Sequence, residues 1–202
     1  MRHNLAMKLK IVQAGEPVLR QEARELTRDE IRSRTTQELI EWMRQTMYDA
    51  PGVGLAAPQV GLGFQLAVIE DKPEYIKGVA PERVKEMRRQ PVAFHVIINP
   101  QITLDNGSPA EFFEGCLSLS GLMALVPRAS RVHVDCLDHN GDPKHIDANG
   151  WYARILQHEI DHLRGTLYVD HMFSRSLMPV EQYNRHWKDK SIPSIKSELR
   201  VE

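Results

Sequence analysis

Residues 158–162 read His-Glu-Ile-Asp-His, a pattern whose two histidines and glutamate could bind and use a metal ion. On an α-helix, the imidazoles of His158 and His162 lie one turn apart on the same face, so both can bind one ion. Glu159 can then reach a water on that metal and take its proton. Two histidines leave the coordination incomplete, so the third ligand decides which kind of hydrolase the pattern serves.

The third ligand could come from two places. In the longer metalloprotease pattern it is a histidine, but that position holds Tyr168, and His171 lies out of register. Glu181 could serve as a downstream carboxylate ligand, although nothing in its local sequence supports the role. Cys116 is the other candidate, because a thiolate binds zinc or iron strongly. A cysteine taken alone is more often a buried structural thiol, and Cys136, alternating with valines, reads as one.

Composition limits the other functions of this chain. The 202 residues predict a single domain, residues 1–202, and 26 Lys+Arg against 27 Asp+Glu give no strong field for nucleic acid or anionic lipid. No apolar run reaches the roughly 18 residues of a membrane helix, and the start lacks the apolar core of a signal peptide. We therefore expect free thiols, no specific nucleic acid, no membrane and a monomer by default.

The apolar patterning predicts an α+β fold with mostly antiparallel sheets. A capping box at 35–38 predicts an N-terminal helix over 37–49. A second helix is expected over 149–164, with Gly165 as its C-cap, and a third over 179–190. We expect strands at 9–14, 65–70, 92–99 and 131–137, a hairpin turn at Asn140-Gly141, and an exposed insertion with a short helix at 71–91. Strands outnumber helices and separate them, which argues against a βαβ repeat.

Three segments of the chain form a distinctive set. Residues 52–59 read Gly-Val-Gly-Leu-Ala-Ala-Pro-Gln, residues 114–118 read Glu-Gly-Cys-Leu-Ser, and residues 157–162 read Gln-His-Glu-Ile-Asp-His. All three, in this order and at these separations, are highly specific, and in them the chain resembles the peptide deformylases. The resemblance covers about residues 10–172 and leaves 173–202 as a C-terminal tail. The insertion is similar to that of a subgroup with plant and animal organelle enzymes, to which bacteria also contribute members.

The resemblance implies an α+β fold with the metal helix packed centrally against the sheets. It also implies hydrolysis of the formyl group from the N-terminal formyl-methionine of newly made polypeptides. The implied metal ligands are Cys116, His158 and His162, and metal-bound water would attack the formyl carbon with Glu159 as general acid/base. Gln59 and the backbone N–H of Leu117 would be the donors to the developing oxyanion. Gly54 would hydrogen-bond the peptide.

The substrate methionine needs an apolar pocket, for which Val53, Trp151 and Ile155 are the candidates by their position near the motifs. Arg154 would lie at the pocket rim and meet the peptide, or else be a solvated surface arginine. Met123 stands where many members of the family have an arginine that can hold the peptide. A methionine cannot do so, which puts the binding of longer substrates in question.

The resemblance favours one Fe(II) per chain, with Zn(II), Ni(II) or Co(II) as alternatives. The expected partners are N-formylmethionyl nascent peptides. The weakly basic C-terminal stretch is more often only a solvated helix face, and contact with the ribosome is the weaker alternative. The expected location is the bacterial cytoplasm, or alternatively an organelle. Two other functions stay open: an endopeptidase that uses the same helix, and a non-catalytic binder of formylated peptides.

Overall fold

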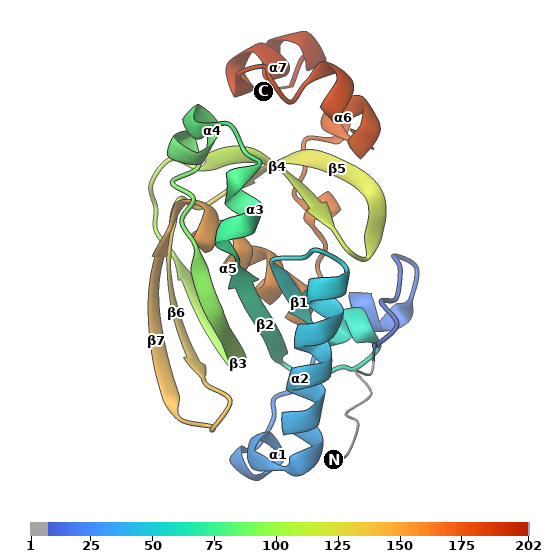
Figure 1. The fold of residues 1–202 in the computed structure, drawn as a ribbon, viewed down its shortest axis with the longest axis vertical. Helices are drawn as coiled ribbons and strands as arrows, with labels where there is room; N and C mark the ends of the chain where they lie inside the picture. The colour runs from blue at the N-terminus through green and yellow to red at the C-terminus, as the bar shows by residue number, and fades with distance from the viewer. Residues whose placement is uncertain (1–7, 202) are drawn as a thin grey trace.

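The computed structural model describes residues 8–201, which form two antiparallel sheets around one buried helix, α5 (Gly150–Leu163). The larger sheet has the order β1 (Gly54–Ala56), β2 (Leu66–Asp71), β3 (Val92–Leu104), β6 (Arg131–Leu137) and β7 (Pro143–Asn149). The smaller sheet has the order β4 (Ala110–Cys116), β5 (Leu119–Arg128) and β8 (Met178–Pro179). The predicted α+β class with antiparallel pairing is confirmed, and Figure 1 shows α5 behind the β1–β2 end of the larger sheet.

Helix α5 is held by an apolar stripe that packs on the larger sheet. Ile155, Leu156 and Ile160 are almost fully buried against residues of β2, β3, β6 and β7. The helix ends where predicted, because Gly165 adopts the left-handed conformation (φ 71°) that follows many helix C-termini. Burial of this stripe fixes the rotation of the helix and therefore the direction of its polar side chains.

Helix α2 (Arg34–Asp49) covers the other face of β1 and β2, with Met43 and Met47 fully buried. Its predicted start was wrong by three residues. The side chain of Ser33, not Thr35, caps the helix by accepting a hydrogen bond from Thr36 N. A capping box does occur, between Thr27 and Glu30, at the start of the short helix α1 (Arg28–Arg32).

The predicted strand at 9–14 is wrong. This segment is not part of either sheet, because its backbone partners lie in a 3-10 helix and a turn rather than in a strand. Val12 N donates to the carbonyl of Gln59, in the 3-10 helix η2 (Ala57–Val60), at 2.9 Å. Ala14 N donates to the carbonyl of Ser118 at 2.8 Å.

The insertion carries two short helices, α3 (Pro73–Lys77) and α4 (Pro81–Glu86), neither of which has a buried residue, but Asp71 and Met87 are buried. Asp71 is fully buried and accepts two hydrogen bonds from Arg89, at 2.7 and 2.8 Å. The guanidinium of Arg89 lies 5.2 Å from the centre of the Trp151 ring. Trp151 N also donates to the carbonyl of Met87 at 2.9 Å, so the insertion is fastened to the start of α5.

The C-terminal stretch folds back onto the smaller sheet. It comprises β8, α6 (Val180–His186) and α7 (Ile192–Leu199), which lie above β5 in Figure 1. Met123 pairs with Met178 of β8 and packs in the apolar cluster that these elements form with β4 and β5. Short 3-10 helices complete the fold: η1 (Pro17–Arg20), η3 (Tyr168–Asp170) and η4 (Ser174–Ser176). Within residues 8–201, no helix has the length and apolarity that crossing a membrane requires.

The packing of α5 predicts a strong effect of Leu156→Ala on stability. Leu156 is fully buried, so truncation should leave a cavity and lower the free energy of unfolding by about 2–5 kcal/mol. Leu104→Ala on β3 is the matched control, because that leucine is 51% exposed. Urea unfolding of both variants checks this, and equal losses of stability in the two would contradict it.

Candidate active site and metal centre

The structure brings Cys116 to the two histidines of α5. One ligand atom from each of Cys116, His158 and His162 lies within 4.8 Å of the other two, and Cys116 Sγ is 3.2 Å from His162 Nε2. Among the described residues no other such group of three occurs. A thiol and two imidazoles are the donors that zinc and iron accept, and three protein ligands leave a coordination position for water or substrate. The residues present therefore fit one divalent ion.

Glu114 is the buried carboxylate that organises these ligands. It lies two residues before Cys116 on β4, so both side chains point to the same face of the strand. Glu114 Oε2 is 3.0 Å from His158 Nδ1, which leaves the other ring nitrogen free to ligate. Burial opposes its ionisation, but hydrogen bonds from His158 and Arg128 hold the pKa of Glu114 well below its usual range. The carboxylate therefore stays charged and fixes the orientation of His158.

Glu159 points into the same space but has a very different environment. It is 3% exposed, and burial raises the pKa of its carboxyl group to about 7. Its Oε2 is buried and makes no hydrogen bond to any residue between 8 and 201. A Cβ atom on Gly54 would lie 2.8 Å from Glu159 Cγ and closer still to Oε1, so only glycine leaves room for this carboxylate.

Gln59 is buried, so it is not the surface glutamine that its local sequence would also allow. Its Oε1 accepts a hydrogen bond from Ala56 N at 2.8 Å, which turns the amide nitrogen toward the ligands. That nitrogen lies 3.5 Å from Cys116 Sγ and 3.3 Å from Ser118 Oγ. The N–H of Leu117 makes no hydrogen bond to another described residue. Both groups are placed as donors beside the ligand cluster.

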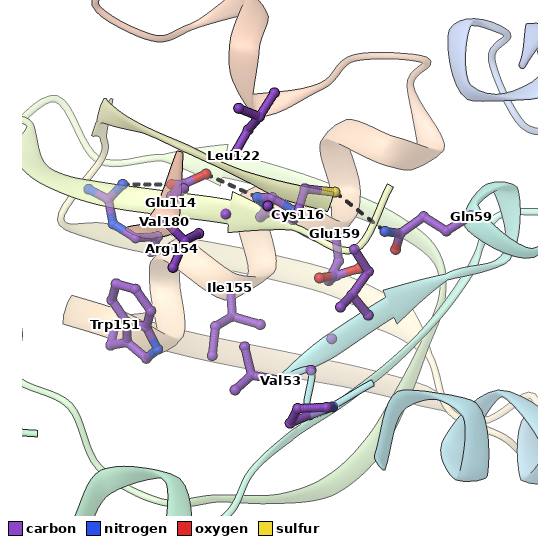
Figure 2. Close-up of a pocket in the computed structure, with 17 residues that line it drawn as sticks. Val53, Gln59, Glu114, Cys116, Leu122, Trp151, Arg154, Ile155, Glu159 and Val180 are labelled. Atoms are coloured by element: carbon purple, nitrogen blue, oxygen red, sulfur yellow. Dashed lines mark hydrogen bonds and ion pairs between the residues drawn. The ribbon is translucent and has the colours of Figure 1, made fainter. Parts of the chain in front are cut away.

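An apolar cavity of about 310 Å³ opens beside the cluster. The three expected pocket residues, Val53, Trp151 and Ile155, all line it, as Figure 2 shows. Leu122 and Val180 complete the wall, and neither was expected. Val180 lies 64 residues beyond Cys116 in the chain, in a stretch interpreted as a tail, so no local pattern could have indicated it.

Arg154 lines the pocket, as expected, and it is not a solvated surface arginine. It is 3% exposed, and its guanidinium donates to Glu114 Oε1 at 2.6 Å and to the carbonyls of Ala110 and Val126 at 2.6 and 2.9 Å. Figure 2 shows it turned toward Glu114 at one end of the pocket. Its charge is therefore used inside the protein rather than offered to a peptide.

The alternative third ligands lie elsewhere. Tyr168 is buried with its ring stacked 6.2 Å from that of His158, so it packs behind the cluster. His171 pairs with Asp161 at 3.3 Å, and Glu181 is an exposed residue of α6. The extended metalloprotease arrangement is therefore absent from the described part of the chain.

The sequence analysis gave no role to Glu114 or to Arg128. Arg128 donates to both Glu114 oxygens, at 2.9 and 3.0 Å, and also pairs with Asp161. The spacing of Glu114 and Cys116 was a usable signal, because residues two apart on a strand share a face. Nothing local could have indicated that Arg128 binds the Glu114 carboxylate.

The fold and the three-residue cluster define the class of this chain: an α+β protein in which a cysteine and two histidines could hold a metal ion and leave a coordination position open. Within that class, residues 8–177 match the family model described as polypeptide deformylase. The chain belongs to the polypeptide deformylase family.

Curated relatives agree with that assignment. The chain is 48% identical over 171 residues to the chloroplastic peptide deformylase 1A of Solanum lycopersicum, covering 85% of this chain and 62% of the relative. It is 37% identical over 171 residues to the mitochondrial peptide deformylase of Homo sapiens, covering 84% and 70%. The chain thus spans less than two thirds of the length of the tomato relative.

Solved structures share the fold. A class I type b peptide deformylase from Acinetobacter baumannii, bound to Met-Ala-Ser, superposes with a TM-score of 0.73 and 29% identity, over 83% of this chain and 100% of that one. A peptide deformylase from Synechococcus elongatus in complex with actinonin gives 0.69 and 38%, over 83% and 82%.

The contacts of Glu114 predict that Glu114→Gln weakens metal binding. The amide removes the charge that fixes His158, and loss of such a partner typically costs about 10- to 100-fold in metal affinity. Competition with a chromophoric chelator measures it. Glu111→Gln, three residues earlier on β4 and paired with Lys196, is the control and should bind metal as the wild type does. Equal affinities for all three proteins would exclude the role given to Glu114.

Proposed function

We propose that this protein is a metal-dependent peptide deformylase that removes the formyl group from the N-terminal formyl-methionine of newly made polypeptides and releases formate. The observation that carries the proposal is the Glu159 carboxylate, buried beside three candidate ligands with one oxygen lacking a partner. A buried group without a partner is costly unless it has a use. Membership of the polypeptide deformylase family supports this particular reaction.

Cys116, His158 and His162 would hold one divalent ion, for which the family resemblance favours Fe(II), with Zn(II), Ni(II) and Co(II) as substitutes. When bound, the ion would polarise the formyl group and lower the pKa of a water molecule. Burial lowers the pKa of His162, so its imidazole is neutral, which is the form that ligates.

Glu159 is the general base and acid of the proposed reaction. Its carboxylate takes a proton from the water that adds to the formyl carbon, and it returns that proton to the amine as the carbon–nitrogen bond breaks. The products are formate and a free N-terminal amine. A pKa of about 7 suits both transfers, because near neutral pH the carboxyl group can both accept and release a proton.

Gln59 and Leu117 stabilise the negative charge that develops on the formyl oxygen. The Gln59 amide is fixed by Ala56 N, and the Leu117 N–H has no other partner among the described residues. One such fixed donor is typically worth about 3 kcal/mol, because it need not reorient during the reaction.

The methionine side chain would occupy the cavity beside Val53, Trp151 and Ile155. The peptide backbone would lie along β1, an edge strand with β2 as its one neighbour in the larger sheet, and hydrogen-bond at Gly54. The Met-Ala-Ser bound by the relative from Acinetobacter baumannii supports a peptide that begins with methionine. Met123 faces the C-terminal elements and is not among the cavity residues, so it would not contact the peptide.

The proposed partners are nascent formylmethionyl peptides and, through the basic C-terminal stretch, the ribosome. The relatives include chloroplastic, mitochondrial and bacterial proteins, so the proposed locations are the bacterial cytoplasm or an organelle.

The first test measures formate release from a formyl-Met tripeptide by oxygen-free protein, with bound metal quantified in the same sample. Glu159→Gln should retain the metal and lose at least about 100-fold in turnover, because general acid–base catalysis typically contributes that much. Cys116→Ala should lose the metal itself.

Two results would replace the proposal. A metal-loaded wild type that binds the formyl peptide but releases no formate with Fe(II), Ni(II) or Co(II) would identify a non-catalytic binder. Cleavage of internal bonds in unformylated peptides would identify an endopeptidase. Full turnover by Glu159→Gln would remove Glu159 from the mechanism.

Gly54→Ala tests the fit between β1 and Glu159. The added Cβ must displace the carboxylate, so turnover should fall by at least about tenfold, equivalent to about 1.4 kcal/mol, while the metal stays bound. Gly63→Ala is the control, because a Cβ there meets nothing within 4 Å. Unchanged turnover in Gly54→Ala would show that Glu159 does not need this position.

A further inference from the structure

The N-terminal segment 12–14 joins the two stretches that carry the proposed oxyanion donors. Val12 N donates to the carbonyl of Gln59, and Ala14 N donates to the carbonyl of Ser118, the residue after Leu117. These stretches lie apart in the chain, since η2 follows β1 and the Leu117 turn links β4 to β5, and the Gln59 side chain is a direct bond between them, reaching Ser118 Oγ at 3.3 Å. The three consecutive residues 12–14 add a backbone link between the same two stretches.

The side chain of Gln13 adds two further hydrogen bonds to the same turn. Its Nε2 donates to the carbonyl of Leu117 at 3.0 Å, and its Oε1 accepts from Ser120 N at 3.2 Å. A planar amide that bonds both ends of a turn restrains its rotation as well as its position. Together with Ala14 N, it holds three points of the turn: Leu117, Ser118 and Ser120.

The direction of the Leu117 N–H depends on the conformation of this turn. A donor stabilises a developing oxyanion fully only when it is already aimed at it, because reorientation during the reaction costs free energy. Within the turn, Ser118 N donates a hydrogen bond to Cys116 Sγ at 3.4 Å, but this bond does not hold the Leu117 carbonyl or Ser120. Segment 12–14 holds both of them.

We infer that Gln13 is a positioning residue for the reaction, which acts by holding the Leu117 N–H beside the Gln59 amide in the conformation that receives the formyl oxygen. This inference rests on the proposed function. Gln13 is exposed and would not touch the substrate, so its effect passes through Leu117. Because its side chain is exposed, its removal should cost little stability.

The test replaces Gln13 by methionine, which has a similar length and no amide. Turnover of a formyl-Met tripeptide should fall about tenfold, equivalent to about 1.4 kcal/mol in the barrier, with KM changed less than about twofold. Metal content and melting temperature should stay at wild-type values. Gln45→Met is the matched control, because the Gln45 amide bonds only Glu41, one turn away on α2.

Amide hydrogen exchange over residues 114–120 gives a second measurement that does not depend on activity. Gln13→Met should speed exchange there, since Ser120 N loses its acceptor. Gln13→Glu, which keeps that acceptor but loses the donor to Leu117, should also lose turnover and replaces the methionine variant if that one fails to fold.

The outcomes separate the two proposals. A metal-loaded wild type that releases no formate overturns the proposed function, and the role of Gln13 with it. An active wild type with turnover within about twofold in Gln13→Met, despite faster exchange of the turn, overturns the positioning role alone. An equal fall in Gln45→Met would show that the loss does not come from the Leu117 turn.

Discussion

The burial of one charged carboxylate, Glu114, is the constraint on which the site depends. A buried charge is tolerated only when opposite charges and donors surround it, and Glu114 receives Arg128, Arg154 and His158. Those partners come from β5 and α5, so satisfying one carboxylate ties the smaller sheet to the central helix. The same contacts aim His158 at the ligand cluster and place Arg154 in the pocket wall. The same contacts therefore set both the geometry of the site and the packing of the smaller sheet against α5.

Glu159 carries the same carboxyl group as Glu114 in the opposite environment. Glu114 has charged partners and its pKa is lowered, whereas burial raises the pKa of Glu159 to about 7 and leaves one oxygen without a partner among residues 8–201. The two carboxylates therefore differ in what they can do: one is fixed in its charged form against His158, and the other is suited to exchange protons. The position of the Glu159 carboxylate depends on Gly54, because a side chain there would displace it.

The sequence predicted the elements whose patterns are long and regular. The helices that became α2 and α5, the β6–β7 hairpin around Asn140-Gly141 and the buried Cys136 follow from apolar spacing and turn residues. The prediction failed where partners outside the segment decide the conformation. Residues 9–14 read as a short strand, but their backbone partners lie in a 3-10 helix and a turn. The burial of Arg154 could not be predicted, because its position on the helix also allows an arginine exposed to solvent.

The sequence by itself determined the chemistry that is available: two histidines one helical turn apart, a glutamate between them, a single candidate thiol and glycines where a backbone must approach closely. The resemblance of three short segments indicated the family. Only the tertiary structure decided which groups meet. It brought Cys116 to His162 across 46 residues, buried Gln59 beside them, and placed Val180 of the C-terminal stretch in the pocket. Such contacts depend on the packing of both sheets against α5, and no local pattern of residue types encodes that packing.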